Sequence, residues 1–177
     1  MCGIVGGITS KNITPLLMDG LKRLEYRGYD SSGLVILSQD NKLVRERAAG
    51  KVSNLENNLK RIKPSLKGNV GLAHTRWATH GKPSVNNAHP HISKNSISVV
   101  HNGIIENYID LKDLQMKQGY EFTSETDTEV IAHAIESAIK PTNSLLKATQ
   151  KAIKTLNGSY GIGALSPEYP DQIIAAR

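Results

Sequence analysis

The only cysteine of this 177-residue chain is its second residue. The run that follows Cys2, GIVGGI, predicts a buried strand that begins at the thiol. Removal of Met1 would leave Cys2 with a nucleophilic sulfur and a free α-amine, whose pKa in model peptides is about 7.7–8.0. That amine can act as the base for the sulfur without a histidine partner. The alternative interpretation is that Cys2 is a small hydrophobic residue near an end of the chain.

Three further segments need to be explained together with Cys2: residues 26–33 (YRGYDSSG), 74–81 (HTRWATHG) and 101–107 (HNGIIEN). Taken singly, their residues have ordinary structural interpretations. Asn102 and Gly103 after a β-rich run favour a hairpin turn, and Trp77 favours a core aromatic side chain.

Two charged residues also have structural interpretations when they are considered alone. Arg76 fits a surface arginine at the end of a strand. Asp127 fits an acid in the first turn of a helix, where it would stabilise the helix dipole by about 0.3–1 kcal/mol. A functional interpretation of either residue therefore has to come from the rest of the chain.

The composition narrows the possible classes of protein. With 38% hydrophobic and 21% charged residues, the chain resembles one ordinary globular domain. The net charge is +6, but the densest basic stretch, residues 42–67, contains two glutamates and no aromatic residue, which argues against nucleic-acid binding. Charges interrupt every hydrophobic run before the roughly 18 apolar residues that a membrane span needs. One cysteine forms no internal disulfide and no signal peptide is recognisable, so we expect a cytoplasmic protein.

Six histidines raise the question of a metal site. Their spacings match no common zinc pattern, and there is no second cysteine to complete one. We therefore expect no metal and no cofactor.

The hydrophobic periodicity predicts an α+β fold with strands first, helices in the middle and strands again. Strands are expected at residues 3–8, 32–37, 43–47, 69–78, 96–101, 159–165 and 172–176. Helices are expected from Thr14 to before Gly28 and at residues 54–62, 106–117, 126–140 and 142–156. Thr126 and Glu129 have capping-box spacing, Pro141 should end that helix, and Thr142 should cap the last one.

The four segments resemble, in the same order, those of the glutamine amidotransferase domain of the glutamine–fructose-6-phosphate aminotransferase family. The resemblance runs from Met1 to Arg177. Amidophosphoribosyltransferases resemble the first segment but differ where this chain has Tyr26, Tyr29 and Trp77. Asparagine synthetases lack the string RWATHG. The aminotransferase family therefore fits best.

The resemblance implies three catalytic residues. The thiolate of Cys2 would attack the side-chain amide of L-glutamine and form a glutamyl thioester, which water then hydrolyses. The Asn102 side-chain amide and the Gly103 backbone N–H would donate to the oxyanion, and one such donor typically contributes about 2.7–4 kcal/mol. Ammonia is the product that is passed on.

The resemblance also implies residues that bind the substrate. Arg76 would hold the α-carboxylate of glutamine through two parallel hydrogen bonds, and Asp127 would accept its ammonium group. A loop that covers the substrate would carry Trp77, Thr79 and His80. Arg27 would support the surroundings of the nucleophile, without an assigned step.

The fold implied by the resemblance is that of the N-terminal-nucleophile hydrolases, a four-layer αββα sandwich with two antiparallel sheets. We expect residues 1–177 to form a type 2 glutamine amidotransferase domain that is incomplete at its C-terminal end and lacks the sugar-isomerase domains. In the family those domains bind fructose 6-phosphate, which accepts the ammonia, and the full-length protein would be a homodimer. Two alternatives stay open: a catalytically silent glutamine-binding module, and the glutaminase domain of an amidophosphoribosyltransferase.

Overall fold

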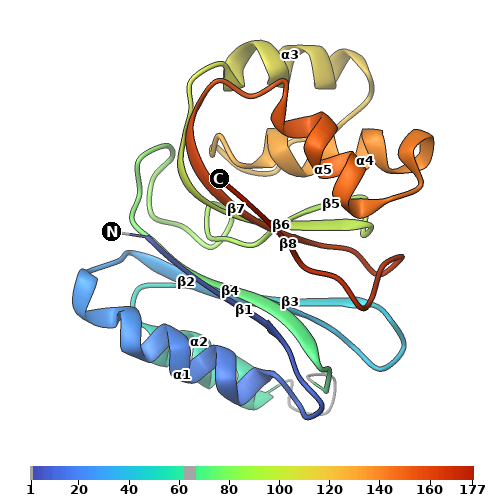
Figure 1. Cartoon of the computed structure of the whole chain (residues 1–177). Coiled ribbons are helices and arrows are strands. Elements are labelled where there is room, and N and C mark those ends of the chain that lie inside the picture. Colours follow the sequence, from blue (N-terminus) through green and yellow to red (C-terminus); the bar gives the residue numbers. More distant parts are fainter. Residues whose placement is uncertain (1, 62–66) are drawn as a thin grey trace.

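Two antiparallel sheets lie face to face in the computed structural model, which describes residues 2–61 and 67–177 (Figure 1). Sheet A has the strand order β1-β4-β2-β3 and sheet B the order β5-β6-β7-β8. Sheet A consists of β1 Gly3–Ile8, β4 Val70–Arg76, β2 Ser31–Leu37 and β3 Leu43–Ala49. Sheet B consists of β5 His91–Ser93, β6 Ile97–Ile105, β7 Gly158–Leu165 and β8 Ile174–Ala176.

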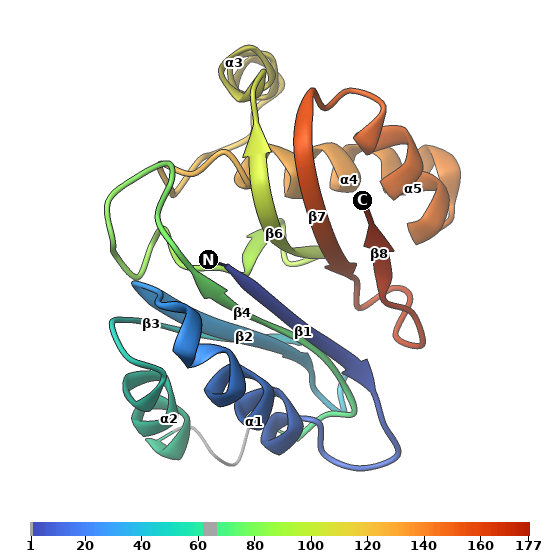
Figure 2. The same ribbon diagram turned by 60° about the vertical axis from the view of Figure 1, so that its left-hand side comes forward.

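Helices cover the outer face of each sheet, which gives four layers (Figure 1). Sheet A is covered by α1 Thr14–Leu24 and α2 Val52–Arg61, and the short 3-10 helix η1 Glu25–Arg27 follows α1. Sheet B is covered by α4 Glu129–Thr142 and α5 Leu145–Ile153, and α3 Tyr108–Lys117 follows the end of β6 (Figure 2). The predicted α+β class is therefore confirmed, with two antiparallel sheets between helices.

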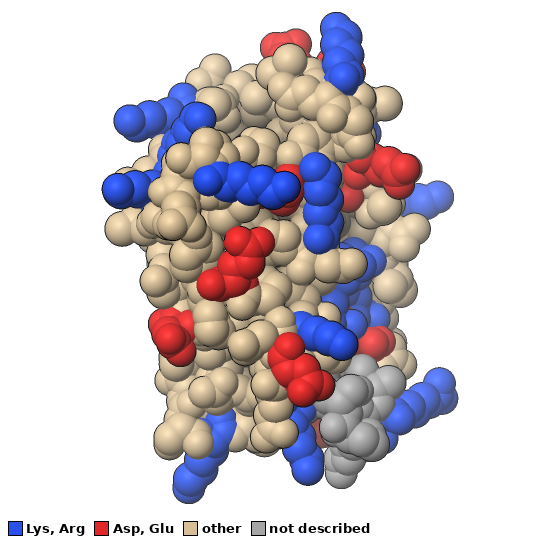
Figure 3. Space-filling view, turned by 90° about the vertical axis from the view of Figure 1, so that its right-hand side faces the viewer, with Lys and Arg blue, Asp and Glu red and all other residues tan. Residues whose placement is uncertain are grey.

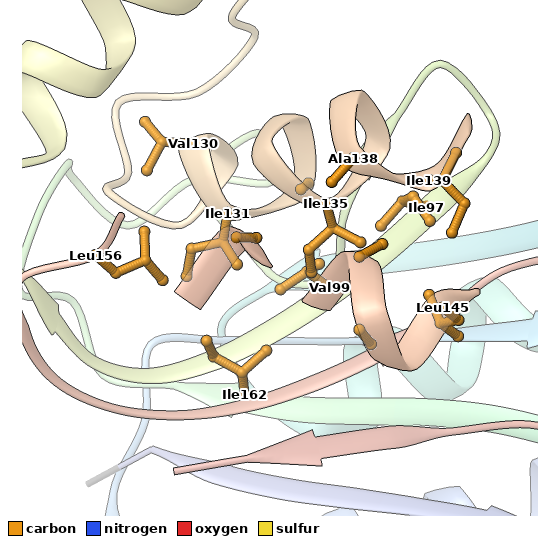
Figure 4. Close-up of a cluster of buried hydrophobic side chains, with 14 of the residues drawn as sticks. Ile97, Val99, Val130, Ile131, Ile135, Ala138, Ile139, Leu145, Leu156 and Ile162 are labelled. Carbon is orange, nitrogen blue, oxygen red and sulfur yellow. The ribbon is translucent and has the colours of Figure 1, made fainter. Parts of the chain in front are cut away.

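The outer core on sheet B shows why these elements form. In α4 the buried residues Ile131, Ile135 and Ile139 recur at helical spacing and pack in one cluster with residues of the strands below (Figure 4). A second buried aliphatic cluster joins sheet A to α1 and α2. Burial of a large aliphatic side chain contributes roughly 1.5–3 kcal/mol, so these two clusters hold each sheet to its own helices.

A third buried cluster lies between the two sheets and contains Leu72 from β4 and Val100 from β6. Ala73, the neighbour of Leu72, belongs instead to the cluster with α1 and α2. Because side chains alternate along a strand, His74 also faces sheet B, and Asn102, two residues after Val100, faces sheet A. The space between the sheets is thus aliphatic at one end and polar at the other.

Several predicted element boundaries were wrong. Asn102 and Gly103 lie inside β6, because this strand continues to Ile105 against β7, so the hairpin-turn interpretation is incorrect. The 3-residue strand β5 was not expected, and the predicted end of the second helix at residue 62 falls outside the described residues.

Three helix ends also differ from the prediction. Thr126 does not cap α4, because its hydroxyl bonds to the His91 ring, and α4 begins only at Glu129. Pro141 does not end α4, since in the last turn it removes only its own N–H; the left-handed Asn143 ends this helix. Ser144, rather than Thr142, caps α5 and accepts from the Lys147 N–H.

The surface does not concentrate basic charge on the face shown in Figure 3, where acidic side chains lie between the basic ones. Across residues 2–61 and 67–177, the structure contains no helix with the length and apolar character of a bilayer span.

Candidate active site

A cavity of about 350 Å³ opens at the polar end of the space between the sheets. Its described lining residues are Cys2, Arg76, Trp77, Thr79, His80, His89, His101, Asn102, Gly103, Ile104, Thr126, Asp127 and Thr128. Every predicted site residue except Arg27 is among them. Segments that are a hundred residues apart in the sequence therefore meet in one cavity.

Cys2 lies immediately before β1, and β1 pairs with β4 so that Gly3 is opposite Thr75. Its half-buried sulfur accepts a hydrogen bond from the Trp77 N–H at 3.1 Å. The same Sγ lies 3.6 Å from the Trp77 carbonyl oxygen. The main chain at Trp77 thus fixes the sulfur at the edge of the cavity.

Arg76 ends β4 and its side chain is buried. Its Nη1 lies 3.4 Å from Asp30 Oδ1, while Nη2 donates to the carbonyl oxygens of His80 and, at 2.9 Å, Gly81. The other oxygen of Asp30 accepts from the Ala78 N–H. Arg76 and Asp30 therefore hold the segment after β4 in place, a function that the sequence did not indicate for either residue.

Asn102 and Gly103 lie side by side in β6 at the cavity. The Asn102 Oδ1 is 2.7 Å from Nε2 of the buried His74 in sheet A. Gly103 has φ +128°, and a Cβ there would lie 2.0 Å from the Ser159 carbonyl oxygen. Only glycine fits this position, because any larger residue would clash with β7 and would need a strained backbone conformation.

Asp127 is buried just before α4 and is tied to sheet B. Its Oδ2 accepts from the Ile105 N–H at 2.8 Å, and its Oδ1 lies 4.0 Å from Nδ1 of His101. Because this carboxylate bonds to a neighbouring strand, its position is not explained by the helix dipole alone.

The loop after β4 forms one wall of the cavity with Trp77, Thr79 and His80. Trp77 is 53% exposed, so its interpretation as a core aromatic residue is wrong. The His80 ring meets Tyr108 of α3 edge to face, with 5.2 Å between the ring centroids. Arg27 lies outside the cavity lining; its Nε donates to the hydroxyl of Tyr26.

A network of buried histidines and threonines supports the cavity. The sequence analysis did not predict it, because it considered His89 and its neighbours in the network only as possible metal ligands. The Thr128 hydroxyl lies 2.9 Å from His101 Nδ1 and 3.0 Å from His89 Nε2. The His89 and His74 rings are in contact, with centroids 4.2 Å apart. Burial lowers the pKa of His74 to about 3 and that of His89 well below 6.5, so both rings are neutral near pH 7.

Gly33 in β2 allows the segment before β5 to approach sheet A. A Cβ on Gly33 would lie 2.2 Å from the His89 carbonyl oxygen, so no larger residue fits. Arg47 on β3 donates to the carbonyl oxygens of Asn86 and Ala88 in the same segment. Within residues 2–61 and 67–177, no group of three or more His, Cys, Asp or Glu side chains is arranged to hold a metal ion.

Comparisons with known sequences identify relatives along the whole chain. A family model of the glutamine amidotransferase domain matches residues 74–177. The chain is 52% identical, over all of its 177 residues, to glutamine–fructose-6-phosphate aminotransferase [isomerizing] from Acinetobacter baylyi and from Pseudomonas putida. It spans 28% and 29%, respectively, of the length of these curated relatives.

Solved structures show the same arrangement of layers. A structure of the allosteric regulatory enzyme of purine biosynthesis aligns with a TM-score of 0.77 and 28% identity, over 93% of this chain and 36% of that one. Glutamine phosphoribosylpyrophosphate amidotransferase from B. subtilis aligns with a TM-score of 0.72 and 27% identity, over 94% and 35%. These similarities confirm the predicted N-terminal-nucleophile amidotransferase fold. On the match of sequence and fold together, the chain belongs to the glutamine amidotransferase domain family.

Proposed function

We propose that this chain hydrolyses L-glutamine to glutamate and ammonia through a thioester on Cys2. One observation supports the substrate above all. Among the described residues that line the cavity, Arg76 is the only Lys or Arg and Asp127 the only Asp or Glu. An amino acid with one carboxylate and one ammonium group matches one cation and one anion, and the cavity volume of about 350 Å³ suits a small ligand.

The proposed reaction starts at the sulfur that the Trp77 N–H orients. Sγ of Cys2 attacks the side-chain carbonyl carbon of glutamine, the C–N bond breaks, and ammonia leaves with the proton taken from the thiol. Water then attacks the thioester carbon, the C–S bond breaks, glutamate is released, and a proton from the water passes to the sulfur. The α-amine of Cys2 is the proposed carrier of the proton in both steps, so the mechanism requires removal of Met1.

The oxyanion of each tetrahedral intermediate is assigned to the Asn102 side-chain amide and the Gly103 N–H. Donors that are already in position cost no reorganisation during the reaction, which is why one of them is worth about 2.7–4 kcal/mol. The β6 strand supports this assignment, because it is paired with β7 along this stretch and holds both residues in place.

Arg76 and Asp127 are the proposed partners of the α-carboxylate and the α-ammonium group. Arg76 was expected to bind the α-carboxylate through two parallel hydrogen bonds. Its Nη2 instead donates to the carbonyl oxygens of His80 and Gly81. We propose that Nη2 orders the loop with Trp77, Thr79 and His80 while the remaining guanidinium N–H groups and the positive charge attract the carboxylate. Arg27 is proposed to act only indirectly, through the segment that contains Asp30.

The acceptor of the ammonia is proposed from the relatives, whose names include fructose 6-phosphate. Their 52% identity to this chain, against 27% for the phosphoribosylpyrophosphate amidotransferase structure, favours that acceptor over a phosphoribosyl one. We propose that fructose 6-phosphate binds to a sugar-isomerase part of the protein, and that the full protein is a cytoplasmic homodimer.

Three measurements test this function. Intact mass should show that Met1 is removed. An electrophilic ketone analogue of L-glutamine should label Cys2, while its D-enantiomer should not. Glutaminase activity should fall by on the order of 10³-fold or more in Cys2→Ala, because the covalent route is lost.

The outcomes separate the alternatives. Labelling and ligand binding without ammonia release would favour a silent glutamine-binding module. Unchanged activity in Cys2→Ala would overturn the thioester mechanism, and full activity with Met1 retained would overturn the assignment of the α-amine.

A further inference from the structure

The hydrogen bond between His74 and Asn102 joins the two sheets at the cavity. His74 lies on β4 of sheet A and Asn102 on β6 of sheet B, with 2.7 Å between Nε2 and Oδ1. His74 is fully buried, and its ring is held from the side by His89. A buried polar contact of this kind restricts both partners to one arrangement.

The chemistry of the two groups fixes the direction of this bond. Burial keeps the His74 imidazole neutral near pH 7, so it carries a single hydrogen. An amide oxygen can only accept, so that hydrogen lies on Nε2 and is donated to Asn102 Oδ1. The Nδ2 group is then the end of the amide that is left for the cavity, which Asn102 lines.

We propose that His74 is a positioning residue that turns the donor end of the Asn102 amide toward the reacting carbonyl. This inference rests on the proposed glutaminase function and adds to it the residue that orients the oxyanion donor. Without His74, the amide of Asn102 can rotate and present its oxygen to the cavity. An oxygen at that position would repel the developing negative charge instead of stabilising it.

Two substitutions of similar size separate positioning from packing. In His74→Gln, the side-chain Nε2 is as many bonds from Cα as the imidazole Nε2, so an N–H donor is retained. In His74→Asn, the amide nitrogen corresponds to imidazole Nδ1 and does not reach Asn102. We expect kcat for glutamine hydrolysis to fall about 10²–10³-fold in His74→Asn and less than about tenfold in His74→Gln. KM should change little in either variant.

Binding measurements distinguish positioning from a purely structural role of His74, because a structural role would not change the affinity for one ligand selectively. The γ-aldehyde analogue of glutamine adds the Cys2 thiol across its C=O bond: an S–C bond forms, and the proton passes to the oxygen. That oxygen occupies the oxyanion position. The affinity of the protein for the aldehyde should therefore fall in His74→Asn by the same factor as kcat. The affinity for L-glutamate, which forms no tetrahedral adduct, should stay within about threefold. Equal losses for both ligands would overturn the proposal.

A double-variant measurement identifies the residue through which His74 acts. If it acts through Asn102, the variant with His74→Asn and Asn102→Ala should be no slower than Asn102→Ala alone. Additive losses would contradict the proposal.

Nitrogen-15 NMR of the wild-type protein tests the orientation without relying on activity. The spectrum should show a neutral His74 ring that is protonated at Nε2. A ring protonated at Nδ1 alone could not donate to Asn102 Oδ1 and would overturn the proposal. A wild-type protein without Cys2-dependent hydrolysis would refute the proposed function, while the NMR result would still decide whether His74 orients Asn102.

Discussion

The two ends of the space between the sheets differ sharply, although the same strands build both. The β4 residues that face sheet B are Val70, Leu72, His74 and Arg76, in that order. At the first end they pack with aliphatic side chains such as Val100 of β6. At the second end, two residues further on, imidazole, guanidinium, amide and thiol groups meet.

This difference shows how one pair of sheets separates stability from chemistry. The aliphatic end fixes the spacing of the sheets through non-directional packing. The polar end then needs specific hydrogen bonds, because buried polar groups without partners are costly. If the two ends have these separate functions, substitutions at the aliphatic end should change stability and substitutions at the polar end should change the rate.

The largest change in stability is expected at the aliphatic end. Leu72 is 1% exposed, and Leu72→Ala should lower the free energy of unfolding by about 2–5 kcal/mol, because it leaves a cavity between the sheets. Urea unfolding measures this loss. The control Leu146→Ala, on an exposed side chain of α5, should cost less than about 0.5 kcal/mol. A stable Leu72→Ala protein that has lost its activity would contradict the proposed separation.

The largest effect at the polar end is expected on rate. Asn102→Ala should lower kcat about 10²–10³-fold, equivalent to about 2.7–4 kcal/mol, because one proposed oxyanion donor is lost. Steady-state glutaminase kinetics measure this change. The control Asn107→Ala removes an asparagine that bonds to the 155–157 segment outside the cavity lining, and its kcat should match the wild type.

The buried histidines of the polar end should make stability depend on pH. The pKa of His74 is lowered to about 3 by burial, and burial also lowers those of His89 and His91. Between pH 6.5 and 3 the unfolded chain therefore binds more protons at His74 than the folded protein does. The contribution of the neutral, buried histidines to the free energy of unfolding is therefore complete above pH 6.5 and is lost as the pH falls. The loss is up to about 1.4 kcal/mol for each histidine and each pH unit. Urea unfolding at pH 7 and 5.5 should show a smaller loss in His74→Gln.

The smallest effect is expected far from both ends. Ser144 caps α5 by accepting the Lys147 N–H, and Ser144→Ala should lower the free energy of unfolding by about 1 kcal/mol. Thermal unfolding measures this loss, and kcat should be unchanged. A fall in kcat would mean that the outer helical layer contributes to the site directly.

The sequence predicted the fold class and most elements, because long helices and β-branched strands follow hydrophobic periodicity. It failed at Asn102 and Gly103, where a pair of residues typical of turns lies within β6. Pairing with β7 overrides this local preference, and local patterns contain no information on such long-range pairing. The predicted start of α4 was wrong for a similar reason. The Thr126 hydroxyl, which was expected to cap this helix, bonds to His91 instead.

The resemblance predicted which residues gather at the cavity, whereas their supporting contacts were not predictable. His74 is two positions before Arg76 on the same face of β4, and this spacing was the available signal. Its partner lies 28 residues away in the other sheet, so nothing local indicates the bond. The bonds of Arg76 to its own loop were likewise hidden, because they depend on how the chain turns after β4.

Because the proposed nucleophile comes from one sheet and the proposed oxyanion donors come from the other, the proposed catalytic set exists only while the two layers keep their alignment. A slip of one strand position would move Cys2 relative to Asn102 by about 3.3 Å, more than a hydrogen bond tolerates. Heating should therefore inactivate the protein at a temperature below its melting point, as soon as the layers loosen against each other.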